Sequence, residues 1–94
     1  MVSKLNGKIF ATQDRDDEEV TFYKVLRSTT NTCEVVHMRK SVVYQTEDYQ
    51  FVEPGKEIPD RKTRCKVISP ERIKLKSSGD EAFIWDGKPL KQTA

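Results

Sequence analysis

The sequence predicts a single all-β domain over residues 1–94, a small barrel or sandwich of about six short antiparallel strands. Val outnumbers Leu by nine to four and Ala occurs three times, and residues branched at Cβ favour extended backbone over helix. No stretch of ten or more residues has apolar positions at the helical period. Turn residues recur about every 8–12 positions, which is typical of small barrels and sandwiches.

The composition predicts a thin core. Hydrophobic residues make up 35% of the chain and charged residues 34%. Leu, Ile, Val and Phe together are 22 of the 94 residues, just above the level of about 20% below which chains tend to be disordered. We therefore expect a folded domain with a frayed N-terminus.

Alternating apolar residues between turn signals locate the strands. We expect them at residues 8–13, 20–27, 33–38, 49–52, 64–69, 72–77 and 81–85. Residues 41–45 either extend the third of these or begin a new strand after a bend. Pro54-Gly55 predicts a turn, residues 57–63 a polar loop, and the chain after about residue 88 a tail. A barrel of the Src-homology-three type is the favoured arrangement, because closure removes the exposed edges of so polar a sheet.

The last expected strand carries the single tryptophan. Phe83 and Trp85 share one of its faces and Ile84 lies on the other. Trp85 either closes one end of the barrel as part of the core or is exposed as an anchor for a protein partner.

Two segments resemble small proteins encoded by bacteriophages and other mobile elements. They are the hairpin with Phe22-Tyr23-Lys24-Val25, a Thr-rich turn and Val35-Val36, and the motif W-D-G-K-P at residues 85–89. The resemblance implies a setting, the cytoplasm of a bacterial host, and no particular mechanism. The acidic run at residues 14–19 departs from the pattern.

Enzymatic, metal-binding and membrane functions find no support. There is one histidine, so no nucleophile–base arrangement is evident. Cys33 and His37 lie too far apart on a straight strand to share one ion, and no cysteine or histidine pair has ligand spacing. We expect no cofactor and no membrane span, and we expect Cys33 and Cys65 to be free thiols in a reducing compartment.

The acidic run DRDDEE has two interpretations. It is either a solvated loop or a patch that meets a basic partner surface, with phosphate mimicry as its sharpest form. The acids concerned are Asp14, Asp16, Asp17, Glu18 and Glu19.

A basic stretch follows later in the chain. Residues 61–76 carry a charge of +6, although the whole chain carries +2. The bases are Arg61, Lys62, Arg64, Lys66, Arg72, Lys74 and Lys76. Most alternate with apolar residues, so we expect five of them on one outer face. This face either contacts DNA, RNA or another polyanion, or keeps the sheet soluble.

Three functions remain open, all of them non-enzymatic. The first is engagement of a host protein or ribonucleoprotein by a phage or mobile-element protein, including inhibition of a defence nuclease in the manner of an anti-CRISPR protein. The second is direct nucleic-acid binding through residues 61–76. The third is a structural or assembly role in the virion.

Overall fold

The computed structural model describes residues 5–13 and 19–94, and it confirms an all-β protein with antiparallel pairing. The described residues contain no helix, and so none that is long and apolar enough to cross a membrane. The strands are β1 (Ile9–Gln13), β2 (Val20–Ser28), β3 (Thr32–Gln45), β4 (Tyr49–Ser69), β5 (Arg72–Leu75), β6 (Glu81–Ile84) and β7 (Leu90–Thr93).

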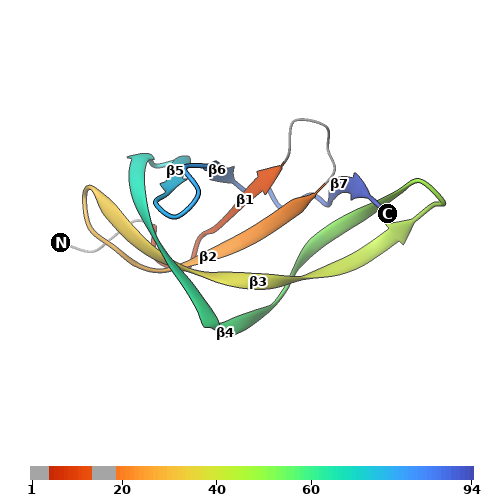
Figure 1. Ribbon diagram of the computed structural model, residues 1–94, viewed down its shortest axis with the longest axis horizontal. Helices are drawn as coiled ribbons and strands as arrows, with labels where there is room; N and C mark the ends of the chain where they lie inside the picture. The colour runs from red at the N-terminus through yellow and green to blue at the C-terminus, as the bar shows by residue number, and fades with distance from the viewer. Residues whose placement is uncertain (1–4, 14–18) are drawn as a thin grey trace.

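The first six strands pair in a ring. Their order is β3-β2-β1-β6-β5-β4, and a pairing between β4 and β3 joins the two ends (Figure 1). This is the connectivity of a barrel. The seam between β1 and β6 is short, because only Phe10 with Ile84 and Ala11 with Phe83 are partners there.

The main core lies inside the ring. Each of the six strands contributes at least one buried side chain to it, and Phe10, Val35 and Ile73 are completely inaccessible. Cys65 of β4 and Leu75 of β5 point into the same cluster. The side chains that alternate toward the inside of the ring therefore form this core, as the sequence predicts.

A second core covers the other face of β1 and β2. Phe22 and Tyr23 are neighbours in sequence and both are buried, Phe22 in this second cluster and Tyr23 in the first. Val52 of β4 and Leu90 of β7 complete the outer cluster. Burial of both faces explains why so short a chain can bury enough apolar surface to fold.

The strand β7 corrects the expectation of a tail after about residue 88. Residues 90–93 pair with residues 49–52 of β4 (Figure 1). The amide of Gln92 is buried, and its Oε1 accepts hydrogen bonds from the backbone N of Val20 at 3.0 Å and from Nζ of Lys40 at 2.9 Å. This amide thus holds β7 onto the start of β2.

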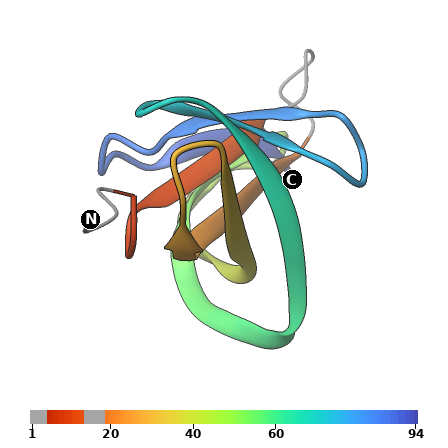
Figure 2. The ribbon, with the colours of Figure 1, turned by 90° about the vertical axis from the view of Figure 1, so that its left-hand side faces the viewer.

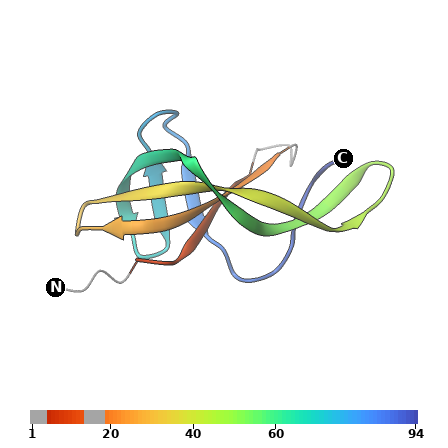
Figure 3. The ribbon, with the colours of Figure 1, turned by 90° about the horizontal axis from the view of Figure 1, so that it is seen from below.

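The strands β3 and β4 are much longer than expected. They span 14 and 21 residues and form a twisted two-stranded ribbon that extends beyond the ring, so the molecule is 46 Å long and 24 Å wide (Figure 3). The expected turn at Pro54-Gly55 is wrong, because Pro54 lies in β4 opposite Lys40. Among the described residues only β3 pairs with this part of β4, and an edge position of this kind tolerates a proline, which lacks an N–H.

The expected loop at residues 57–63 is wrong in its secondary structure, since these residues belong to β4. The ladder is nevertheless irregular here. Glu57 is opposite Met38 and Lys62 is opposite Val36, so residues 58–61 face a single residue of β3. Figure 2, a view along the long axis, shows this stretch of β4 bowing outward as a wide hoop.

Candidate nucleic-acid interface

The basic residues of β4 and β5 lie outside the ring because their neighbours lie inside it. Ile73 is completely buried and Leu75 is 3% exposed, whereas Lys74 between them is exposed. On β4, Cys65 is buried between exposed Arg64 and Lys66. The alternation that the sequence predicts is therefore confirmed in both strands.

Four of the basic residues come together on one surface, which we call the cationic face. Lys66 lies opposite Lys74 in the antiparallel ladder. Arg64 lies opposite Lys76, whose backbone N donates to the Arg64 carbonyl oxygen at 3.1 Å. Within the described part of the chain, none of these four cations forms an ion pair. Opposed like charges are mildly destabilising, so folding alone gives no reason for this arrangement.

Acidic residues border the cationic face without neutralising it. Glu34 of β3 lies opposite Arg64, but its carboxylate pairs with Arg27 at 3.4 Å. On the other side, Glu81 of β6 lies opposite Lys74 and pairs with Arg72 at 3.4 Å. The centre of the surface is therefore cationic and its two borders are mixed.

The remaining predicted cations lie elsewhere or are already engaged. Arg72 is exposed at the border, paired with Glu81. Lys62 is exposed opposite Val36, toward the bend of β4. Arg61 lies in the bowed stretch of β4. Partial burial, and secondarily the charge of Arg61, keep the pKa of His37 below its ordinary value.

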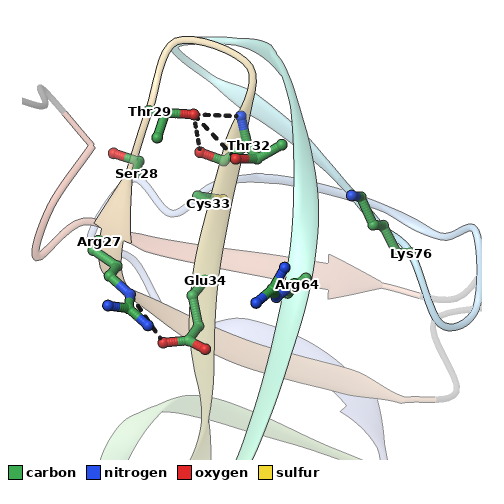
Figure 4. Close-up of a pocket in the computed structure, with 8 residues that line it drawn as sticks. All are labelled: Arg27, Ser28, Thr29, Thr32, Cys33, Glu34, Arg64 and Lys76. Atoms are coloured by element: carbon green, nitrogen blue, oxygen red, sulfur yellow. Dashed lines mark hydrogen bonds and ion pairs between the residues drawn. The ribbon is translucent and has the colours of Figure 1, made fainter.

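A pocket of about 220 Å³ opens where the β2–β3 hairpin meets the cationic face (Figure 4). Arg64 and Lys76 line it from β4 and the residues after β5, and Arg27 lines it from β2. At the hairpin end, the hydroxyls of Thr29 and Thr32 lie 3.0 Å apart. Glu34 also lines the pocket and pairs with Arg27, so the groups left to hold an anion are Arg64, Lys76 and the hydroxyl groups.

Cys33 also lines this pocket, and its side chain belongs to the same inner core cluster as that of Cys65. The two residues are direct partners in the ladder between β3 and β4, and both are free. Their interaction lowers the pKa of Cys33, whose sulfur accepts the hydrogen bond, and raises the pKa of Cys65, the donor. The sequence distance of these cysteines gave no sign of this contact.

Of the five acids of the acidic run, only Glu19 belongs to the described residues. Asp14, Asp16, Asp17 and Glu18 lie outside the described residues, and Glu19 is exposed immediately before β2. The strand ends that bound the run lie beside β7, where Nε2 of Gln13 donates to the carbonyl oxygen of Lys91 at 2.7 Å.

Trp85 packs in the second core and not at an end of the ring. It is half-buried, and its ring meets that of Phe22 edge to face with centroids 5.9 Å apart. Its Nε1 donates to the carbonyl oxygen of Lys88 at 2.7 Å, across the turn in which Lys88 N donates to Asp86. Phe83 shares this face and Ile84 packs on the inner core, as the sequence predicts.

The ribbon carries an exposed apolar stretch that was not expected from the sequence. Val42, Val43 and Tyr44 of β3 are 47%, 48% and 59% exposed. The partners of β2 on β3 end at Met38, so among the described residues the second edge of β3 beyond that point carries no strand. Three consecutive apolar residues, V-V-Y, were the available signal.

Among the described residues, no group of three or more His, Cys, Asp or Glu side chains could hold a metal ion. No known protein family, curated protein or solved structure matches this chain.

Proposed function

We propose that this protein is a non-enzymatic binding protein whose cationic face contacts the phosphate backbone of a nucleic acid, either free or within a ribonucleoprotein. The observation that carries the proposal is the placement of Arg64, Lys66, Lys74 and Lys76 on one surface, without ion pairs in the part of the chain that the structure describes. Adjacent strands lie about 4.8 Å apart, and residues on one face of a strand repeat at about 6.6 Å. Such a grid of cations can contact successive phosphates.

The proposal favours backbone contacts over base recognition. Aromatic side chains that stack on bases are a common feature of single-strand binding surfaces. The tyrosines lie away from the cationic face: Tyr23 is in the core, and Tyr44 and Tyr49 are on the ribbon. We therefore expect binding with little preference for sequence and a strong dependence on salt.

The resemblance of the hairpin and of residues 85–89 to small phage and mobile-element proteins supplies a biological setting for the proposal. In that setting the target is host nucleic acid or a host ribonucleoprotein. Occupying the nucleic acid of a defence nuclease would inhibit that nuclease, which is the anti-CRISPR-like role considered above. A place in the virion is the alternative, and purified particles would then contain the protein.

The direct experiment is a titration of labelled generic RNA and of a DNA duplex, followed by fluorescence anisotropy at several salt concentrations. The slope of the logarithm of the binding constant against the logarithm of the salt concentration measures the number of phosphate contacts. Four contacts predict a slope of about −3 for single strands and about −4 for a duplex. Absence of binding at low salt, with protein at about the 10⁻⁴ M typical of weak non-specific complexes, would refute the proposal.

A second candidate function is engagement of a host protein by strand addition at β3. At Val42, Val43 and Tyr44 one edge of β3 pairs with no other described strand, so backbone N–H and C=O groups lie next to exposed apolar side chains. An extended segment of another chain can pair with such an edge. A partner captured from nuclease-treated lysate by the wild type, and lost when Val43 is replaced by Lys, would support this function. Capture by both proteins alike would exclude this edge.

A further inference from the structure

We propose that Cys33 is a site of oxidation by hydroperoxides and that Cys65 resolves the product into a disulfide between β3 and β4. This inference does not depend on nucleic-acid binding. It rests on the register of the ladder, on the position of Cys33 at the lining of the pocket, and on the different burial of the two cysteines.

The ladder places the Cα atoms of the two cysteines at a separation that a disulfide can span. Cys33 is the direct partner of Cys65 in the antiparallel pairing of β3 with β4. The backbone N of Val67 donates to the carbonyl oxygen of Asn31 at 2.8 Å, which fixes the register two residues away. Directly opposed residues of such a ladder have Cα atoms about 4.5–5.5 Å apart, and disulfides span Cα distances of about 4.4–6.8 Å. Both side chains belong to the inner core cluster, so they lie on the same side of the ladder.

The two thiols differ in access and in acidity. Cys33 is 5% exposed and lines the pocket with Arg64 and Lys76, whereas Cys65 is completely buried. The hydrogen bond donated by Cys65 lowers the pKa of Cys33, and the thiolate is the nucleophilic form of a cysteine. Cys33 is therefore the more accessible and the more acidic of the two cysteines.

The chemistry balances with hydrogen peroxide as the only co-reactant. The Cys33 thiolate attacks one peroxide oxygen, the O–O bond breaks, and the sulfenic acid forms with release of one water after proton uptake. The Cys65 sulfur, losing its proton, then attacks the Cys33 sulfur and displaces its hydroxyl group as a second water. Two thiols are oxidised by two electrons, and one peroxide is reduced to two waters. A dithiol reductant reverses the step.

The test uses the wild-type protein, folded and at neutral pH, treated with hydrogen peroxide. Intact mass and peptide mapping under non-reducing conditions should show the loss of two hydrogen atoms and a Cys33–Cys65 cross-link, both reversed by dithiothreitol. Because this experiment uses no variant, a failure to fold cannot obscure the result. A protein that keeps both thiols, that stops at oxidised single cysteines, or that forms only cross-links between molecules would overturn the proposal.

Two serine variants separate the roles of the thiols. In Cys65→Ser, Cys33 should accumulate as a sulfenic acid that reacts with dimedone. In Cys33→Ser, Cys65 should react at least tenfold more slowly, because its side chain is completely buried. Circular dichroism of both variants shows whether they are folded, and the wild-type cross-link decides the proposal if either is not. Equal labelling of the two folded variants would overturn the assignment of Cys33 as the attacked residue.

Discussion

Lys66 of β4 and Lys74 of β5 lie directly opposite each other, and both side chains are exposed on the outside of the ring. Like charges at opposed positions of a ladder destabilise the folded protein, whereas a pair of opposite charges at the same positions would stabilise it. The fold alone gives no reason for this pair, whereas a polyanionic ligand does. The pair therefore allows the demands of stability and of binding to be separated.

Replacing Lys66 by Glu should stabilise the protein and weaken its binding to nucleic acid. The new carboxylate would face Lys74 on one side and Thr32 on the other, so we expect the free energy of unfolding to rise by about 0.2–1 kcal/mol. Affinity for generic nucleic acid should fall, because one phosphate contact becomes a repulsion. Urea unfolding and fluorescence anisotropy on the same preparation measure the two effects.

Lys56→Glu is the matched control for this change. Lys56 is exposed on the same strand but beyond the bend at residues 58–61, and its substitution alters the net charge by the same amount. It should leave affinity nearly unchanged. Equal losses in Lys56→Glu and Lys66→Glu would show that total charge, and not the cationic face, governs binding.

Replacing Gln92 by Ala should destabilise the protein by about 1–3 kcal/mol, because the buried N–H of Val20 loses its acceptor. Gln50→Ala is the control variant. The Gln50 side chain accepts a hydrogen bond from Nε2 of Gln92 at 2.9 Å in a part-buried place, and among the described residues it bonds no backbone group. Its cost should be smaller. Equal midpoints of chemical unfolding for the two variants would contradict the role assigned to Gln92.

The stability of the wild type should fall in mild acid through His37. Burial, and secondarily the charge of Arg61, lower the pKa of His37 from its ordinary value of 6.5. Between the lowered folded pKa and the unfolded value the unfolded chain binds more protons, so stability is fully present above about pH 6.5 and declines as the pH falls. In His37→Gln this part of the pH dependence should be absent. Parallel pH profiles of unfolding midpoints for the two proteins would contradict the assignment.

Val43→Lys should change the free energy of unfolding by less than about 0.5 kcal/mol, because Val43 is 48% exposed and lies beyond the ring. A charge on a free strand edge opposes pairing with other chains. The substitution should therefore reduce concentration-dependent association, measured by analytical ultracentrifugation. A loss of stability comparable to that of a core substitution would show that the ribbon edge packs against another part of the chain.

The sequence was most informative where local pattern decides the structure. Alternation in R-I-K-L of β5 and around Cys65 of β4 correctly predicted which side chains face inward, because a strand has no other choice once one face is buried. Phe22 and Tyr23, adjacent and both apolar, could also have indicated a strand with two buried faces.

The sequence was least informative where distant segments decide the structure. Pro54-Gly55 has a strong turn preference, yet β4 continues through it in pairing with β3, with a register shift between Met38 and Lys40. The residues of β7, L-K-Q-T, carry no apolar alternation, and the strand exists because it pairs with β4 and because Gln92 meets Val20. The contact of Cys33 with Cys65 likewise depends on the register, which no local pattern encodes.

The most direct test of the cationic face is the salt dependence of nucleic-acid binding by the double variant Lys66→Gln, Lys74→Gln. For a DNA duplex, the loss of two phosphate contacts should make the plot of log binding constant against log salt concentration less steep. The magnitude of its slope should fall by about 1.8 relative to the wild type. The control Lys56→Gln, Lys88→Gln removes the same charge from other exposed positions and should keep the wild-type slope. A slope unchanged in the first variant, or reduced equally in both, would contradict the account.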